Sequence, residues 1–348
     1  MVEPLWRNGT GIERPFSALA GVRCRCSSLP LQRVMTDFGA DEAFGPGAAQ
    51  LKEHYGIEMP ISTIQRTTEH HAECIYEQEV ARVIEPGTAA GLFIGEMDGS
   101  MVPVVEPSPE AEDQRKGKVL SWKEVRLNLV HPQGSVTPVF GGNVVGGVDE
   151  SGRQWARCAA KAGFGPASHL HGLGDGAPWI ANQVALQFGT QGSYLIDFFH
   201  VCEYLGEAAP VCAPDHPQAW LDVQKERLKA HQVAAVLDAL APFLRAADED
   251  NDDDPVTACD RYLRNRLDQL DYHGAIQQGL PIGSGEIESA HRYIIQKRLK
   301  LPGAWWSPDH VKTMLALRLN RANREWEAYW QRAEKEAAGT GQATVASL

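Results

Sequence analysis

The chain has 348 residues, of which 43% are hydrophobic, and it carries a formal net charge of −12. This length allows two or three domains with at least one large core, and the composition is typical of globular proteins. No run approaches the roughly 20 apolar residues that span a bilayer, and the start of the chain lacks the layout of a signal peptide, so we expect a cytoplasmic protein with no membrane contact.

Cysteine usage indicates a reducing compartment. The seven cysteines are odd in number and show no CxxC spacing, which favours free thiols over a disulfide framework. Cys24 and Cys26 could form half of a zinc site, but no matching pair lies nearby in the sequence.

The acidic balance argues against a general affinity for nucleic acid, since proteins that neutralise phosphates usually carry a basic surface. The charge is unevenly distributed, however. Residues 248–254, DEDNDDD, hold six carboxylates and predict a solvated loop. Residues 289–300 contain no acid and four basic side chains, namely Arg292, Lys297, Arg298 and Lys300. The positive charge is therefore local.

Residues 46–72 predict two helices joined by a tight turn. The first helix has an apolar stripe and is followed by Gly56, a residue type that commonly ends helices. This spacing is that of a helix-turn-helix, in which four residues of the second helix would lie on or near the face that meets a DNA groove, namely Gln65, Arg66, Thr68 and Glu69. Two ordinary packed helices are the alternative interpretation.

The middle of the chain predicts an α/β fold, a mixed sheet flanked by helices. Three strands are expected first, followed by helix, strand, helix and then a strand that enters a helix, at residues 91–105, 122–132, 137–148, 149–164, 167–179, 180–189 and 192–205. The segment from 206 to 275 is helical and polar, which indicates an all-helical insertion. A further helix is predicted after Ser307.

Three acidic residues occupy positions that suit catalysis. Asp98 interrupts an apolar strand in GEMDGS, and the following glycine leaves its carboxylate accessible. Asp175 stands between two glycines in LGDGAPW at the end of a strand, the edge where open α/β sheets assemble ligand sites. Glu288 belongs to a predicted helix, where it shares a face with Ile295 and should point inward more than Glu286.

An inward carboxylate costs several kcal/mol unless it is protonated or paired, and a divalent cation removes that cost. Oxygen ligands from separate parts of the chain suit Mg²⁺ or Mn²⁺, and two such ions about 3.5 to 4 Å apart clamp the attacking and leaving oxygens of a phosphoryl transfer. Asp197 and His200 follow the next strand. Both could support such a site without binding the metal, or Asp197 could itself be a ligand. The alternative for this pair is that Asp197 caps a helix and His200 packs against its neighbours. The alternative for Asp175 is that Gly-Asp-Gly forms an ordinary turn.

Four stretches of the chain resemble a known family. MDGSMVPV, GDGAPWI, IDFFHVCEYL and above all PIGSGEIESAHRYIIQKRLKLPGAWWS are similar to the transposases of ISKra-type bacterial insertion sequences, relatives of the Mutator-like transposases. The resemblance covers roughly residues 15–335. It implies a ribonuclease-H-like core, interrupted by a helical insertion, in which an Asp-Asp-Glu triad binds two Mg²⁺ or Mn²⁺ ions. The triad falls on Asp98, Asp175 and Glu288.

One departure from the family pattern concerns the second aspartate. The DFFH of this chain corresponds to a Cys-x-x-His signature that follows the second aspartate in Mutator-like relatives, with Asp197 in place of the cysteine. Asp197 is therefore a rival to Asp175 for the role of second metal ligand.

The resemblance divides the chain into five parts. These are an N-terminal DNA-binding region with the helix-turn-helix, the first part of the catalytic core, the helical insertion, the remainder of the core with its C-terminal helix, and a flexible tail, at residues 1–88, 89–205, 206–275, 276–335 and 336–348.

The implied activity is hydrolysis of DNA at transposon ends, followed by transfer of the 3′-hydroxyl into target DNA. The implied partners are the double-stranded DNA of the terminal inverted repeats and of the target, together with at least one further copy of the chain at the bacterial nucleoid. Phosphates of the transposon end would be held by the basic residues of the last motif, which are Arg292, Lys297, Arg298 and Lys300. A metal-dependent nuclease without strand transfer, and a DNA-binding repressor or inactive remnant of an insertion element, are the alternatives.

Overall fold

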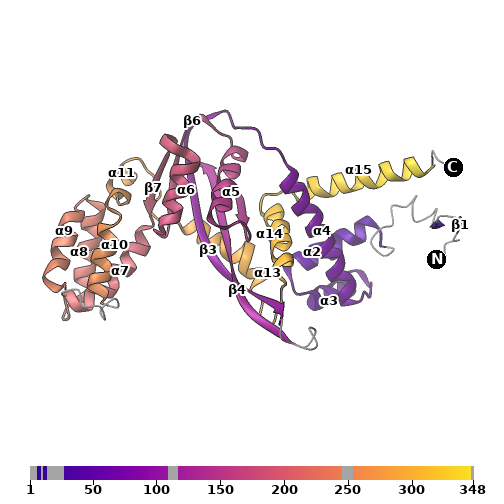
Figure 1. Ribbon diagram of the computed structural model, residues 1–348, viewed down its shortest axis with the longest axis horizontal. Coiled ribbons are helices and arrows are strands. Elements are labelled where there is room, and N and C mark those ends of the chain that lie inside the picture. The colour runs from indigo at the N-terminus through magenta and orange to yellow at the C-terminus, as the bar shows by residue number, and fades with distance from the viewer. Residues whose placement is uncertain (1–5, 9–10, 14–26, 109–116, 245–253, 346–348) are drawn as a thin grey trace. The chain divides into compact units, whose positions relative to one another are not determined.

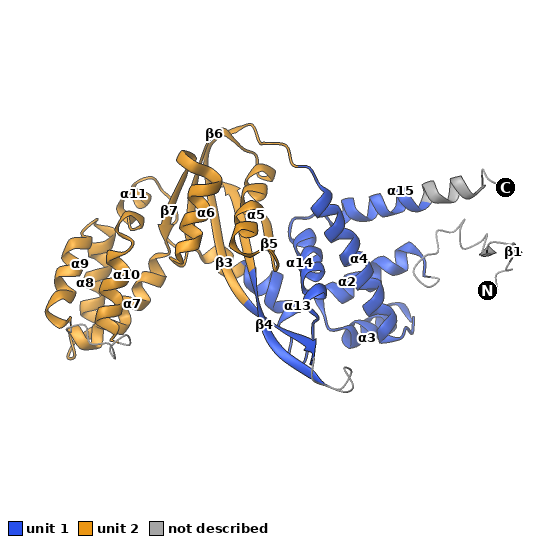
Figure 2. Ribbon diagram, viewed as in Figure 1, with its two compact units in different colours: residues 1–83, 101–125, 290–348 blue, residues 84–100, 126–289 orange. Residues whose placement is uncertain are grey.

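The computed structural model describes residues 6–8, 11–13, 27–108, 117–244 and 254–345 (Figure 1). Two compact units are formed (Figure 2), one by residues 1–83, 101–125 and 290–348 and the other by residues 84–100 and 126–289. Cys24, Cys26 and most of the acidic run 248–254 lie outside the described residues. No helix in the described part of the chain is long and apolar enough to cross a bilayer.

A five-stranded mixed sheet lies mainly in the second unit, and the far ends of its two longest strands, residues 101–107 and 118–125, belong to the first. In spatial order its strands are β5 (Val139–Asn143), β4 (Lys118–Pro132), β3 (Ala89–Pro107), β6 (Phe164–Gly174) and β7 (Gly192–Ile196). β5 pairs antiparallel with β4, whereas β3, β6 and β7 run parallel. The α/β fold of ribonuclease-H-like type that the sequence predicted is confirmed.

The alternation of side chains along β3 gives this sheet two buried faces. Phe93 packs with α5 (Gly147–Lys161) and α6 (Pro178–Phe188) around the fully buried Trp155. Its neighbour Ile94 belongs to a different core cluster, together with α7 (Phe198–Cys212). Because alternate residues of a strand share a face, Glu96 and Asp98 lie on the side of Ile94, away from α5 and α6.

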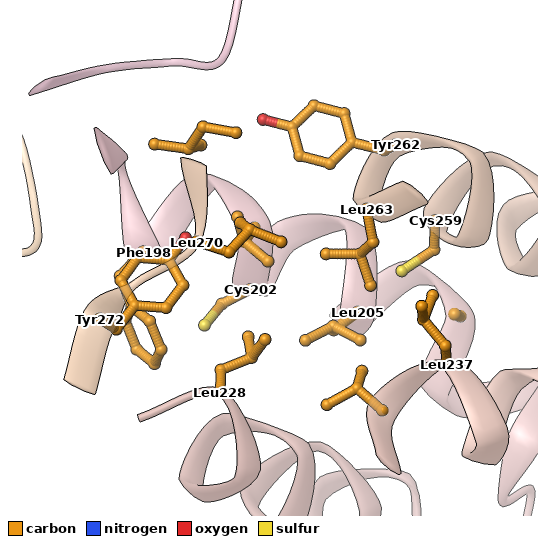
Figure 3. Packing of buried hydrophobic residues seen from close by; sticks show 14 of the residues in the cluster. Phe198, Cys202, Leu205, Leu228, Leu237, Cys259, Tyr262, Leu263, Leu270 and Tyr272 are labelled. Atoms are coloured by element: carbon orange, nitrogen blue, oxygen red, sulfur yellow. The ribbon is translucent and has the colours of Figure 1, made fainter. Parts of the chain in front are cut away.

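The segment predicted as a helical insertion, residues 206–275, is helical, and its helices begin before it and end just after it. They are α7, α8 (Pro217–Lys229), α9 (Val233–Leu240), α10 (Pro255–Arg264) and α11 (Tyr272–Gln277). Short helical turns also occur at η1 (Gly189–Gln191), η2 (Ala241–Phe243) and η3 (Leu267–Gln269). Their core cluster, part of which Figure 3 shows, includes Leu173, Leu195 and Ile196 of the sheet. The insertion is thus packed onto the sheet through one continuous apolar core.

The first unit is mainly helical. Its elements include β1 (Trp6–Asn8), β2 (Gly11–Glu13), α2 (Leu29–Asp41), α3 (Phe44–Tyr55), α4 (Ile61–Ala81), the π-helical η4 (His291–Gln296), α13 (Lys297–Leu299), α14 (Pro308–Ala322) and α15 (Trp326–Val345). Met35, Leu51 and Ile64, one from each of the first three long helices, form a small core. Residues 336–345, predicted as part of a flexible tail, continue α15.

The N-terminal helices add to the predicted pair. Helix α2 carries the apolar residues Leu31, Met35 and Phe38 at helical spacing, and its buried face also includes the polar residues Gln32 and Thr36. Gly39 of α2 lies so close to α4 that an added Cβ would stand 2.1 Å from Oγ1 of Thr68. Thr68 is therefore buried between these helices, which corrects its expected place at a DNA groove. Gly56 ends α3 with φ 66°, as predicted.

Candidate carboxylate site

Three aspartates lie where the parallel pairing of β3, β6 and β7 ends: Asp98 within β3, Asp175 after β6 and Asp197 after β7. When the register of β3 and β6 is continued two residues beyond its last pair, Asp98 comes opposite Asp175. On the other side of β6, the amide of Asp197 donates to the carbonyl of Gly174 at 2.8 Å. Asp98 and Asp175 are half-buried, whereas Asp197 is buried. The structure thus gathers the first two predicted ligands and the rival aspartate at one edge of the sheet.

The chain returns to this edge just before α12 (Gly285–Ala290), the helix that carries Glu288. Nε2 of His171 on β6 donates to the carbonyl of Pro281 at 2.9 Å. Burial lowers the pKa of His171, against the opposite effect of this bond, and so favours the neutral imidazole. The amide of Phe198 donates to the carbonyl of Ile282 at 2.8 Å. These bonds hold the segment before α12 against β6 and the start of α7.

Asp197 joins the start of α12 to the start of α7. Its Oδ2 accepts from both the amide and the hydroxyl of Ser284, each at 2.6 Å. Its Oδ1 accepts from the amides of Phe199 at 2.6 Å and His200 at 3.2 Å, and so caps α7. Four neutral donors occupy the positions at which a carboxylate accepts, which favours a supporting role for Asp197 over a metal-binding role.

His200 is directed elsewhere. Its Nδ1 lies 3.2 Å from Oε2 of Glu203, and its ring packs edge-on against Tyr204 with centroids 5.7 Å apart. Only the backbone amide of His200 reaches Asp197. The imidazole therefore contacts side chains of its own helix, α7, and makes no hydrogen bond to the carboxylate of Asp197.

Glu96, which the sequence analysis did not single out, is the most buried carboxylate of the site. Its side chain is 1% exposed, and Oε2 accepts the amide of Ile287 at 2.7 Å. This bond attaches the first turn of α12 to β3, two residues before Asp98. An acidic residue two before Asp98 in GEMDG shares its strand face, and that spacing was the one available signal.

Glu286 and Glu288 are both exposed, and Ile287 is the inward residue of this turn. The expectation that Glu288 points inward is corrected. The expectation assumed one uniform α-helix from Glu288 to Ile295. The chain instead becomes the π-helical η4 directly after α12, and a π-helix has more residues per turn, so residues of the two segments do not share the face that an α-helix would give them. Nε2 of the buried His131 on β4 lies 3.2 Å from Oε2 of Glu286.

The loop that carries Asp175 is held on both sides. Oδ1 of Asp175 accepts the amide of Ala177 at 2.8 Å, and its Oδ2 accepts no hydrogen bond from the described residues. The hydroxyl of Tyr262 donates to the backbone carbonyl of Asp175 at 2.9 Å. Nε of Arg266 donates to the carbonyl of Gly176, also at 2.9 Å. Tyr262 and Arg266 belong to the helical insertion, so the insertion contacts this loop directly.

Arg298 is the clearest correction among the predicted DNA-binding residues. It is 2% exposed, and its Nε donates to the carbonyl of Gly39 at 2.8 Å. The guanidinium lies 4.6 Å from the ring centroids of both Phe44 and Trp306. Burial lowers the pKa of Arg298 to about 10. Arg298 is therefore part of the core of the first unit and is not positioned to meet phosphates.

The other predicted DNA contacts are accessible to different extents. Arg292 is exposed, Lys300 is half-buried, and Nζ of Lys297 lies 3.7 Å from Oδ2 of Asp41. In α4, the guanidinium of the exposed Arg66 donates to Ser62 of the preceding turn.

Gln65 of α4 is half-buried, and its Nε2 donates to Oε1 of Glu69 at 2.9 Å. This bond joins successive turns of the helix. For Gln65, as for Arg66, Arg292, Lys297 and Lys300, DNA binding stays a prediction.

The carboxylates of the site are the ligand type that a hard cation prefers, but they do not form a tight cluster in this structure. Among the described residues, no three His, Cys, Asp or Glu side chains converge closely enough to hold a metal ion. Burial, and then the nearby carboxylates of Glu286, Asp197 and Glu288, raise the pKa of Glu96 to about 8, against the effect of the Ile287 amide. A divalent cation would offset this excess of negative charge, and oxygen donors are the ligands that Mg²⁺ and Mn²⁺ prefer.

One family model matches part of the chain. Residues 166–334 match the family described as an uncharacterised protein family, UPF0236. The matched region contains Asp175, Asp197 and Glu288 and begins after Asp98. A search among curated proteins found no match.

Proposed function

We propose that this chain is a DDE transposase, which hydrolyses DNA at transposon ends and joins the freed 3′-hydroxyl to target DNA. The proposal is carried by the position of Asp98 and Asp175 at one edge of neighbouring parallel strands, to which the first turn of the Glu288 helix is attached. Ligand sites of α/β sheets form at this edge. The resemblance of the same residues to ISKra-type transposases supports the assignment.

Asp98, Asp175 and Glu288 would hold two Mg²⁺ or Mn²⁺ ions. When bound, these ions supply the positive charge that favours ionisation of water and stabilises the leaving 3′-oxygen of DNA. The Ala177 amide orients one oxygen of Asp175, whose other oxygen accepts no bond from the described chain. Glu288 is exposed, so its carboxylate is open to a substrate from solution.

DNA would be held by the accessible basic residues of the last motif. Arg292 is exposed, and the side chain of Lys297 is 54% exposed. Phosphate contacts of this kind make affinity fall steeply as salt concentration rises. Each end of a transposon must be processed and the two ends joined together, so at least two copies of the chain are expected to act in one complex.

The test is cleavage of a labelled duplex that carries the element's own terminal inverted repeat, in Mg²⁺ or Mn²⁺ and in EDTA. The wild-type protein should nick the repeat boundary only with metal, and Glu288→Ala should reduce nicking to background while DNA binding is retained. Glu286→Ala is the matched control, because Glu286 is exposed on the same turn of α12 and is not a predicted ligand. It should cleave as the wild type does.

Other outcomes identify the alternatives. Duplex that is bound but never cut by the wild-type protein would contradict the transposase proposal and indicate a repressor or an inactive remnant. Metal-dependent cutting without any joined product in the presence of target DNA would indicate a nuclease. Equal cutting by the wild type and Glu288→Ala would remove Glu288 from the triad.

A further inference from the structure

The loop from Gly174 to Ala177 is bound by the helical insertion at two consecutive backbone carbonyls. Tyr262 of α10 donates from its hydroxyl to the carbonyl of Asp175, and Arg266 donates from Nε to the carbonyl of Gly176, both at 2.9 Å. From the sheet, the hydroxyl of Tyr194 on β7 accepts the amide of Gly176 at 3.1 Å. Three side chains from outside the loop therefore hold two adjacent peptide groups.

The close approach of Tyr262 depends on the residue type at position 176. Gly176 has φ +83°, a left-handed conformation that favours glycine. A Cβ built at this position would stand 2.1 Å from the hydroxyl oxygen of Tyr262. The glycine after Asp175 in GDGAPW thus admits the tyrosine against the loop backbone, which gives the motif a role in addition to the turn.

Tyr262 and Arg266 are themselves held in place. The guanidinium of Arg266 lies 4.1 Å from the centroid of the Tyr262 ring and donates from Nη1 to the Tyr262 carbonyl. The Tyr204 ring stacks on Tyr262 with centroids 4.1 Å apart and planes 19° apart. Tyr262 is 6% exposed, and Figure 3 shows it at the margin of the insertion core, with its hydroxyl directed away from Leu263 and Cys259.

We propose that Tyr262 and Arg266 are positioning residues through which the helical insertion sets the backbone of the Asp175 loop and so the carboxylate of Asp175. The consequence for metal binding rests on the proposed function, in which Asp175 is a ligand. The insertion would then do more than extend the core, because an event that displaces α10 would displace a residue of the triad.

The test compares the full-length variants Tyr262→Phe and Tyr204→Phe with the wild type. Tyr262→Phe removes only the hydroxyl that donates to Asp175, whereas Tyr204→Phe removes a hydroxyl from the ring stacked on it. The first readout is amide hydrogen exchange of peptides that cover residues 174–177, measured without metal. Loss of one hydrogen bond should speed exchange in Tyr262→Phe by about tenfold, and Tyr204→Phe should stay within about twofold of the wild type.

The second readout is Mn²⁺ affinity, measured by titration of the free ion. Loss of a residue that orients a ligand typically weakens metal binding by about tenfold or more, so Tyr262→Phe should bind Mn²⁺ at least that much more weakly than Tyr204→Phe. Arg266→Gln should act in the same direction and replaces Tyr262→Phe as the test variant where the latter does not fold.

The two readouts separate the two proposals. Unchanged exchange at residues 174–177 in both Tyr262→Phe and Arg266→Gln would overturn the positioning role, whatever the activity. A further outcome is that the variants exchange faster at residues 174–177 while the wild-type protein itself binds no Mn²⁺. That result would support the positioning role and contradict the metal-dependent function. Faster exchange with unchanged Mn²⁺ affinity would overturn the link from the insertion to the carboxylate of Asp175.

Discussion

Replacement of Glu96 by glutamine tests the electrostatics of the candidate site. Glu96 is 1% exposed, and burial together with the neighbouring carboxylates raises its pKa from 4.5 to about 8. One pKa unit corresponds to about 1.4 kcal/mol, so ionisation of Glu96 in the folded protein costs about 5 kcal/mol relative to the unfolded chain. Glutamine has no charge to bury, and its amide oxygen can still accept the amide of Ile287.

The sign of the effect follows from proton binding. Between pH 4.5 and about 8 the unfolded chain has lost the Glu96 proton while the folded chain retains it, so the free energy of unfolding falls as pH rises. Below pH 4.5 both states are protonated, and above about pH 8 both are ionised. Relative to the wild type, Glu96→Gln should gain little at pH 5 and about 5 kcal/mol at pH 8.5, with the increase spread over the interval.

The measurement is urea-induced unfolding of both proteins from pH 5 to pH 8.5 in EDTA, which keeps bound cations from neutralising the carboxylates. Glu288→Gln is the matched control, because Glu288 is exposed on the helix whose backbone Glu96 binds, and its stability should follow the wild type. A constant difference between Glu96→Gln and the wild type across this range would refute the reasoning. It would mean that the carboxylate of Glu96 has access to solvent and is not perturbed by burial.

Two further predictions concern residues whose roles the structure revised. Asp197→Asn replaces a carboxylate that accepts four hydrogen bonds by an amide, whose NH₂ group would face the donors of Ser284. Thermal unfolding should therefore show that the free energy of unfolding falls by about 2 to 4 kcal/mol. A variant as stable as the wild type would show that Asp197 does not join α12 to α7. Arg298→Ala should lose about 2 to 4 kcal/mol in urea unfolding because a buried side chain is deleted. Arg292→Ala should leave stability unchanged and reduce the salt dependence of DNA binding by the amount expected for about one phosphate contact. A reduced salt dependence in Arg298→Ala, with none in Arg292→Ala, would restore Arg298 as the phosphate-binding residue.

The sequence was sufficient for the fold class because the relevant signals are local. Apolar strands separated by glycine and proline, and helices with their own end signals, lie within short windows of chain. The order of three strands, helix, strand, helix, strand and insertion was therefore read correctly. That Asp98 and Asp175 belong to one site was implied by the family resemblance, and the parallel pairing of β3 with β6 brings them to the same edge.

Helix α2 was not predicted, although Leu31, Met35 and Phe38 recur at helical spacing. Its buried face also includes Gln32 and Thr36, which belong to no apolar pattern. Their burial depends on the helices that pack against them, and a window of sequence holds no record of those partners. The same limit applies to Arg298, whose basic side chain suggested a phosphate contact until Gly39 and Phe44 were found around it.

The tertiary structure alone decided how the candidate site is held together. Glu96 is a buried acceptor because the amide of Ile287, 191 residues away in the chain, reaches it. Tyr262 contacts the Asp175 loop across 87 residues, and Ser284 meets Asp197 across the same number. The residue types determined which groups could donate, accept or carry charge. Which of them are desolvated, and which donor meets which acceptor, depends on contacts between distant segments, and these exist only after the chain has folded.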